Sequence, residues 1–148
     1  MGYHIETMDK SFYIKNENKA GALQAVKELN KKEQDLGNGG IHYKGKHTRL
    51  FKWVNSTIVN KAKTLEDALS EWRWESTVDS AGNIVDIVFT GEKIGDDTYL
   101  FKAIAAFVKE DSFIEFRGED GHMWSLEFDN GFYLFDGRRK DLLNSKKG

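Results

Sequence analysis

The sequence feature that most constrains the fold is a pair of turn-forming dipeptides in the C-terminal third. Asp120-Gly121 and Asn130-Gly131 separate three short segments in which apolar and polar residues alternate. Such dipeptides close tight β-hairpins because glycine adopts positive φ without steric cost. We therefore expect an antiparallel meander of residues 112–117, 122–128 and 132–135, with Gly121 and Gly131 at positive φ. Proline is absent and glycine occurs 14 times, so Gly, Asn and Asp must form the other turns as well.

The clearest helical pattern precedes this meander. Apolar residues recur at spacings i, i+3, i+4, i+7 and i+8, and Asp96 or Asp97 is the expected N-cap. This apolar stripe and one face of the meander must cover each other to leave water. We therefore expect a single core cluster of Leu100, Ile104, Phe107, Ile114, Phe116, Trp124, Leu126 and Phe128.

The remaining elements have weaker signals. Aromatic and β-branched residues predict a strand over 3–14, and Asn16 is placed to cap a helix over 17–32. Thr64 and Asp67 have capping-box spacing, which predicts a helix ending near Arg73. The turn at 79–83 should join strands 75–78 and 84–90. Glycines in segment 36–40 predict a loop, and we expect a strand over residues 48–54. The sequence pattern is weakest over residues 33–63, so their course is the least predictable.

These elements predict an α+β fold in which helices pack on one face of an antiparallel sheet. Residues 3–29 and 86–108 share the order strand, polar turn, Asn or Asp cap and amphipathic helix. A duplicated βαβ unit of ferredoxin-like layout would explain this order, and chance similarity explains it nearly as well. We expect one domain over residues 1–137 and a frayed basic tail over 138–148.

Catalytic and metal-binding patterns are missing from the sequence. There is no cysteine, and the four histidines His4, His42, His47 and His122 are not at metal-ligand spacing. No phosphate loop, dinucleotide fingerprint or serine nucleophile elbow occurs. A pair of carboxylates could serve catalysis, but the chain has 24 acidic residues. Their abundance therefore does not distinguish a catalytic pair from ordinary surface carboxylates. We expect no cofactor and no metal, and the balance is against an enzyme.

The segment Glu71-Trp72-Arg73-Trp74-Glu75 is the most unusual local sequence. Two tryptophans beside an arginine offer apolar area and a cation for stacking, so Trp72 and Trp74 are candidate binding anchors. The alternative, which we favour, is that both tryptophans are core residues. Trp53 and Trp124, on expected strands, are stronger candidates for the core.

Charge is distributed unevenly along the chain. Residues 1–63 carry 12 Lys and Arg against 6 Asp and Glu, whereas residues 64–137 carry 5 against 17. This asymmetry predicts an acidic face that steers toward a basic protein partner, unless the halves neutralise each other within the fold or between the subunits of a homodimer. The candidate residues of this acidic face are Glu71, Glu75, Glu92, Asp96, Asp97, Glu119 and Asp120.

Nucleic acid is not the expected partner. A basic segment with Lys44, Lys46, Arg49 and Lys52 does interleave with aromatic residues, yet the sequence pI of about 6.1 lacks the basicity that phosphate contacts demand. The N-terminus lacks a signal-peptide pattern, and no apolar run is long enough to cross a bilayer. We expect a cytoplasmic protein without membrane association.

Several local motifs resemble a family of small uncharacterised proteins from Firmicutes and their phages. The resemblance covers most of residues 64–136 and rests on residues 64–69, 71–74, 89–93, 95–97 and 117–121 together with Trp124. The family carries no established activity, so the resemblance implies only a bacterial or prophage setting. We thus expect a non-enzymatic binding protein that engages and inhibits or regulates a host protein through its acidic face. The alternative is a small ligand-binding domain or enzyme with a pocket of tryptophans and carboxylates.

Overall fold

The structure is a computed structural model that describes residues 3–32, 41–43, 46–48, 51, 53–129, 131–136 and 140–144. Its helices are α1 (Lys19–Lys32), α2 (Ser56–Lys61), α3 (Leu65–Glu71) and α4 (Asp97–Ile104). Short 3-10 turns occupy Asn16–Asn18 and Ala105–Phe107. The strands are β1 (Ile5–Ser11), β2 (Ile41–Tyr43), β3 (Lys46–Thr48), β4 (Trp74–Val78), β5 (Ile84–Phe89), β6 (Ser112–Gly118), β7 (Met123–Phe128), β8 (Phe132–Phe135) and β9 (Lys140–Asn144).

The main sheet has five antiparallel strands in the order β1-β6-β7-β8-β9. The predicted meander is confirmed as β6, β7 and β8, and Gly121 and Gly131 have φ of +86° and +149°. The first strand of the chain joins this late meander by pairing with β6, with an irregularity between Thr7 and Lys10. Strand pairing in this sheet therefore joins the N-terminal part of the chain to the C-terminal part.

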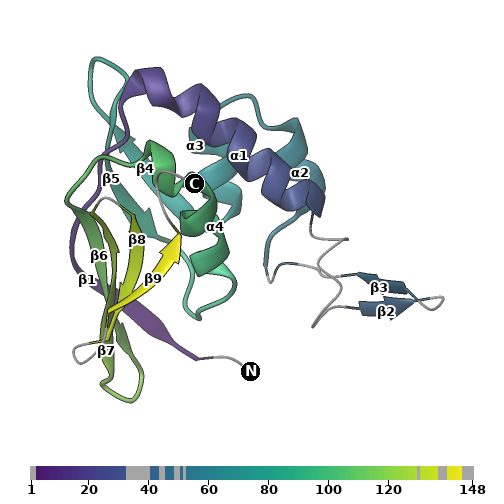
Figure 1. Ribbon diagram of the computed structural model, residues 1–148. Coiled ribbons are helices and arrows are strands. Elements are labelled where there is room, and N and C mark those ends of the chain that lie inside the picture. Colours follow the sequence, from purple (N-terminus) through teal and green to yellow (C-terminus); the bar gives the residue numbers. More distant parts are fainter. Residues whose placement is uncertain are drawn as a thin grey trace.

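The predicted hairpin is also present as the two-stranded sheet of β4 and β5. Asp79 stabilises its turn, because one carboxylate oxygen accepts hydrogen bonds from the backbone N–H of Ala81 and Asn83, both at 2.9 Å. Reciprocal backbone hydrogen bonds of 2.9 Å between Ile14 and Ile84 attach this hairpin to the chain that follows β1. The hairpin thus lies beside the main sheet (Figure 1).

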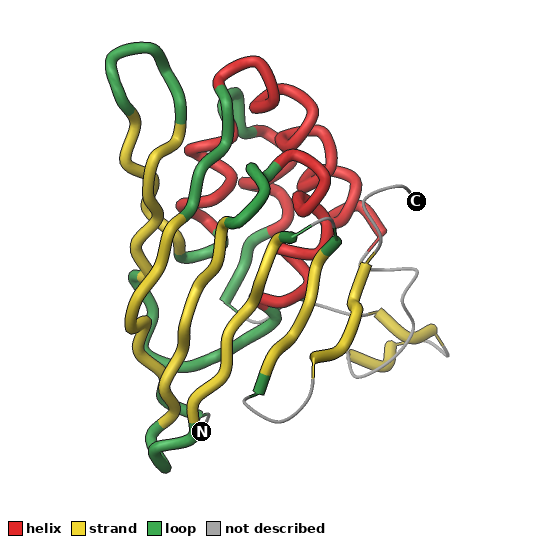
Figure 2. The backbone as a smooth tube through the Cα atoms, turned by 60° about the vertical axis from the view of Figure 1, so that its left-hand side comes forward, coloured by secondary structure: helices red, strands yellow, loops and turns green. Residues whose placement is uncertain are grey.

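The four helices pack on one side of the sheet, which confirms the predicted α+β architecture (Figures 1 and 2). Helix α1 contacts α2, α3 and α4. Thr64 caps α3 as predicted, with Oγ1 accepting from the backbone N–H of Asp67 at 3.1 Å. None of the helices in the described parts of the chain is long and apolar enough to cross a membrane.

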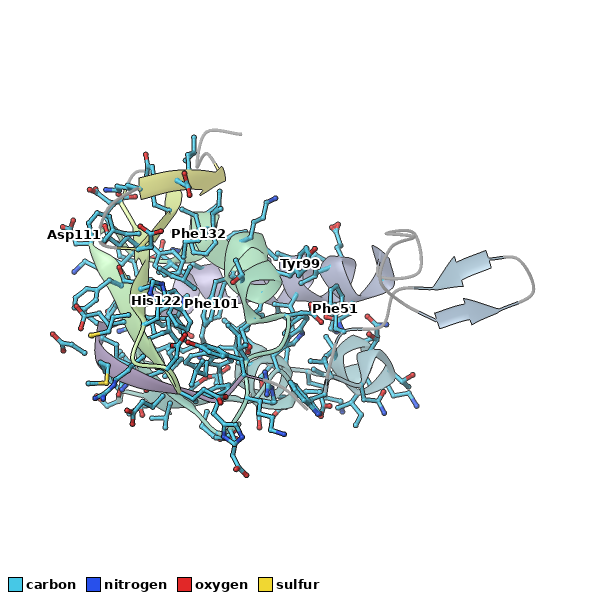
Figure 3. The ribbon with its side chains drawn as sticks, turned by 90° about the horizontal axis from the view of Figure 1, so that it is seen from below. Phe51, Tyr99, Phe101, Asp111, His122 and Phe132 are labelled. Atoms are coloured by element: carbon cyan, nitrogen blue, oxygen red, sulfur yellow. The ribbon has the colours of Figure 1, made fainter. Side chains whose placement is uncertain are left out.

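The buried apolar side chains form one cluster between helices and strands. Six of the eight predicted core residues belong to this cluster, and the other two, Phe107 and Trp124, are partly buried and pack against it. Phe101 of α4 points into the interior (Figure 3), and its ring lies 5.0 Å from that of Trp74 and 6.3 Å from that of Phe128. Edge-to-face aromatic pairs of this kind join the helix layer to the sheet.

Several local predictions were wrong. Asn16 begins a 3-10 turn instead of capping a helix. Residues 51, 53 and 54 are not in a strand, and α2 was not predicted, although Asn55 caps it through Oδ1. The tail is not frayed over Lys140–Asn144, because these residues pair with β8 as β9. The loop at 36–40 lies outside the described residues, and the ferredoxin-like duplication stays a prediction.

Candidate binding site

Arg73 organises the candidate site at the point where the chain turns from α3 into β4. Its φ of +74° is uncommon for a residue with a side chain. Its backbone N–H donates to the carbonyl of Ser70, and its carbonyl accepts from Thr90, both at 2.9 Å. The guanidinium donates from Nη1 to the carbonyl of Lys93 at 2.7 Å and from Nη2 to Oδ2 of Asp97 at 2.9 Å. Arg73 therefore ties the end of α3 to the segment between β5 and α4.

Two aromatic rings lie against this guanidinium. Its central carbon is 4.7 Å from the ring centroid of Trp53 and 5.0 Å from that of Phe89. Trp53 also has a positive φ, of +60°, and it is 49% exposed. Such backbone conformations persist only where surrounding contacts stabilise them, and they concentrate at functional sites. Trp53 and Arg73 thus both have positive φ and lie in contact with each other.

Two glycines allow the β5–α4 segment to close on Arg73. A Cβ atom at Gly91 would lie 2.7 Å from Nη1 of Arg73, and one at Gly95 would lie 2.9 Å from Nη2. The Gly95 position would also meet the ring of Trp53 at 3.1 Å. The motifs at 89–93 and 95–97 thus have a packing explanation, which the spacing of the glycines did not reveal in the sequence.

Asp97 is buried, so it is not part of an exposed acidic face. Its residue is 2% exposed, and its carboxylate accepts hydrogen bonds from Arg73, from Nε1 of Trp74 at 3.0 Å and from the backbone N–H of Gly95 at 3.0 Å. A buried carboxylate needs such partners because its water shell is lost on folding. Asp97 therefore neutralises Arg73 and fixes the two neighbouring segments.

Trp72 and Trp74 are core residues, at 1% and 0% exposure, and do not form a binding pocket. Nε1 of Trp72 donates to Oδ1 of Asn30 at 3.0 Å, and Nδ2 of Asn30 donates to Oγ of Ser56 at 2.8 Å. The favoured structural interpretation of both tryptophans is confirmed. The prediction that Trp53 belongs to the core is wrong, and no local pattern distinguished Trp53 from the buried tryptophans.

Two open cavities meet at Trp53. The larger one, about 800 Å³, is lined mainly by amide, hydroxyl and aromatic groups: Asn30, Lys31, Phe51, Trp53, Val54, Asn55, Ser56, Thr57, Asn60 and Glu71. The smaller one, about 490 Å³, is lined by His4, Trp53, Arg73, Thr90, Gly91, Glu92 and Lys93. Phe51, which lines the larger cavity, packs between two other rings. Its ring centroid lies 5.1 Å from that of Trp72 and 5.7 Å from that of Tyr99 (Figure 3).

The structure divides the predicted acidic residues into groups. Glu92, Glu119 and Asp120 gather around the start of the described chain, where the carbonyl of Glu92 accepts from Ile5 at 3.1 Å. Oε1 of Glu119 accepts from the backbone N–H of His4 at 2.6 Å. All three side chains belong to exposed residues.

Glu71 and Glu75 form a second group at the end of α3. Oε2 of Glu71 accepts from the backbone N–H of Asn55 at 2.9 Å, and Oε1 of Glu75 accepts from Oγ of Ser70 at 2.6 Å. Asp96 is half-buried ahead of α4. Of the seven predicted acids, only Glu71 and Glu92 line the cavities that meet at Trp53.

Tyr3 and Asp120 fasten the N-terminal residues to the β6–β7 turn. The hydroxyl of Tyr3 donates to Oδ1 of Asp120, which also accepts from the backbone N–H of His122 at 3.0 Å. The hydrogen bond from Tyr3 lowers the pKa of Asp120, and the same bond raises the pKa of Tyr3. Asp120 therefore stays ionised to more acidic pH than an ordinary aspartate.

The described residues contain no group of three or more His, Cys, Asp or Glu side chains positioned to hold a metal ion. The side chains of the basic segment, including Lys44, Lys46, Arg49 and Lys52, lie outside what the structure describes. The described groups around Trp53 include aromatic rings, carboxylates and amides.

Comparison with known proteins finds no match: no protein-family model matches the chain, and no curated protein or solved structure is significantly similar to it. The resemblance to proteins of Firmicutes and their phages accordingly stays a prediction.

Proposed function

We propose that this chain is a non-enzymatic binding protein that holds a basic side chain of a partner protein against Trp53. Glu71 in one adjoining cavity and Glu92 in the other supply the opposing negative charge. The observation that carries the proposal is that a half-exposed tryptophan, held by a partly buried arginine, separates two open cavities that each contain a carboxylate.

The side chain of Trp53 is preorganised in the unbound protein. Arg73 and the approach of Gly95 restrain the ring, so little side-chain freedom remains to be lost on binding. Tryptophan and other large rings dominate the binding energy of protein interfaces because they bury much area with few rotatable bonds. Restraint and exposure together distinguish Trp53 from Trp72 and Trp74, which are buried.

The charges around Trp53 favour a single basic residue as the ligand. Tryptophan is the strongest aromatic partner for Arg and Lys cations. The positive charge of Arg73 is neutralised by Asp97, at an Nη2–Oδ2 distance of 2.9 Å. Lys31 and Lys93 also line the two cavities, so a run of several basic residues would meet repulsion. We therefore expect one Arg or Lys flanked by small polar residues.

The acidic excess of residues 64–137 has a supporting role in this proposal. It attracts a basic partner over distances of about 8 Å at physiological ionic strength, which raises the association rate more than the final affinity. If the chain has the bacterial or prophage setting that the family resemblance implies, the partner is a host protein that is inhibited or regulated when its basic residue is covered.

Nuclear magnetic resonance of the tryptophan indole N–H groups tests the proposal. The probes are acetylated pentapeptides of Gly and Ser that differ only in a central Arg, Lys, Leu or Glu. We expect the Arg and Lys peptides to shift the signal of Trp53, assigned with W53F, while the hydrogen-bonded indoles of Trp72 and Trp74 stay in place.

Variants identify the groups responsible. W53A should weaken binding of the Arg peptide about fivefold or more, as expected for a cation–π contact of ~1 kcal/mol. E71Q and E92Q should each weaken it by about two- to fivefold. E75Q is the matched control, because Glu75 is exposed and lines neither cavity around Trp53. Equal binding of the Glu peptide, or binding that survives W53A in a folded protein, would contradict the proposal.

A further inference from the structure

The main sheet exposes one face to solvent, and this face is rich in large apolar side chains. Strand pairing places Phe113, Glu127, Tyr133 and Leu142 in one row across β6, β7, β8 and β9. A second row contains Glu115, Ser125, Phe135 and Lys140. Because side chains alternate along a strand, these rows point away from the buried Ile114, Leu126 and Phe128.

This outer face has no cover among the described elements. All four helices lie on the opposite side of the sheet (Figure 2). Leu142 is 58% exposed, Met123 47% and Phe135 37%. A shallow hollow of about 150 Å³ lies beside Phe135, lined also by Glu115, Met123, Trp124 and Ser125. Large apolar side chains that are exposed together on one sheet face are a common feature of interaction surfaces.

The charges on the outer face are of opposite sign at its two sides. Glu115 and Glu127 lie on β6 and β7, whereas Lys140 lies on β9 at the edge of the sheet. Nζ of Lys140 is 3.5 Å from Oε1 of Glu127 and 4.5 Å from the ring centroid of Tyr133. Glu115 pairs with Ser125 through the strand ladder, and its side chain forms no hydrogen bond or ion pair with a described residue. A surface with this distribution is complementary to itself after a two-fold rotation.

We propose that the outer face binds a second copy of this chain, sheet against sheet, about a two-fold axis that runs parallel to the strands between β7 and β8. This axis exchanges the positions of β6 and β9. It places Lys140 of each copy opposite Glu115 of the other, and Leu142 opposite Phe113. Phe135 of each copy faces the hollow beside Ser125 of the other. Two sheets pack face to face in this aligned manner at a separation of about 10 Å.

The size and charge of the molecule permit this association. Four to five strands spaced about 4.8 Å apart give a contact of about 24 by 20 Å, or roughly 1,000 Å² of combined surface, at the lower end for specific complexes. The net charge of the whole chain is −2, so two copies repel each other weakly. We therefore expect a dimer that dissociates on dilution.

Sedimentation equilibrium of the full chain over concentrations from about 5 to 500 μM tests the proposal. We expect a reversible monomer–dimer equilibrium. L142D should raise the dimer dissociation constant at least about tenfold, because it places a charge against Phe113 of the other copy. E28K on the exposed surface of α1 is the control and should leave the dissociation constant unchanged.

Charge reversal tests the orientation of the two copies. K140E and E115K should each weaken the dimer, and the double variant K140E/E115K should restore it, because each glutamate then faces a lysine again. E127Q controls for loss of the contact between Lys140 and Glu127 within one chain. Circular dichroism verifies that each variant is folded. A monomer at every concentration, or a double variant that stays as weak as the single ones, would overturn the proposal.

Discussion

At the scale of single residues, Arg73 and Asp97 form an ion pair that lies largely away from solvent. The side chains are 13% and 3% exposed, and the pair joins the end of α3 to the start of α4. Removing one partner of a buried ion pair is costly because the other charge remains away from water. The pair therefore supports the position of Trp53 as well as the fold.

Replacing Asp97 by asparagine should lower the free energy of unfolding by about 3 kcal/mol. Asparagine keeps an oxygen that can accept from Trp74, but it leaves the charge of Arg73 without a counterion. Urea denaturation measures the change, and D67N, at an exposed residue in the first turn of α3, is the control. A loss below about 1 kcal/mol would mean that the ion pair contributes little.

The residue scale is also where the sequence was least informative. Trp53, Trp72 and Trp74 have similar polar and aromatic neighbours, yet one is half exposed and two are buried. The difference arises because Asn30 and Asp97, distant in sequence, satisfy the indole N–H groups of Trp72 and Trp74 in the interior. These hydrogen-bond partners come together only in the folded chain, so the sequence does not reveal them.

At the scale of elements, local chemistry determined the hairpins and most helices. Thr64 caps α3 as predicted, and Gly121 turns β6 into β7 at φ +86°. These features need only neighbouring residues, so their patterns are visible in the sequence. The sequence did not predict β9, because residues 138–148 have the composition of a basic tail. Lys140–Asn144 form a strand because they pair with the edge of β8.

Substitutions at Gly121 test the turn by itself. No atom lies within 4 Å of the position that a Cβ would take, so a side chain introduces backbone strain and no collision. We expect G121A and G121V to lower the free energy of unfolding by about 1 kcal/mol or more. G121N should lower it less, because asparagine tolerates positive φ. Chemical denaturation of the three variants should give this order, and equal stability of all three would contradict the turn assignment.

At the scale of the whole molecule, close packing positions the helix layer. Gly21 in α1 faces Phe107, and a Cβ atom at Gly21 would lie 2.5 Å from Cε1 of that ring. Phe107 follows α4, so this contact sets how closely α1 and α4 approach. Glycine has low helix propensity, but a side chain at this position would collide with the ring of Phe107.

Replacing Gly21 by alanine should therefore destabilise the protein by about 1–2 kcal/mol, against the gain of about 1 kcal/mol expected from helix propensity alone. F107L should reduce this penalty, since the smaller side chain makes room for the new methyl group. A double-mutant cycle by thermal or urea unfolding measures the coupling. A more stable G21A protein would show that α1 and the Phe107 ring separate without cost.

By itself, the sequence determined the α+β class, the hairpins, the helix that begins at Asp97 and the core cluster, because periodicity and turn chemistry act between near neighbours. The predicted helical stripe runs on to Val108, whereas the α-helix ends at Ile104 and a 3-10 turn follows. It also marked Glu71 and Glu92 as candidates among the acids. Only the tertiary structure brought these two residues to cavities on either side of Trp53, buried Asp97 and placed β1 beside β6. Those outcomes depend on contacts between segments many residues apart, which are selected by packing and by the need to pair buried charges.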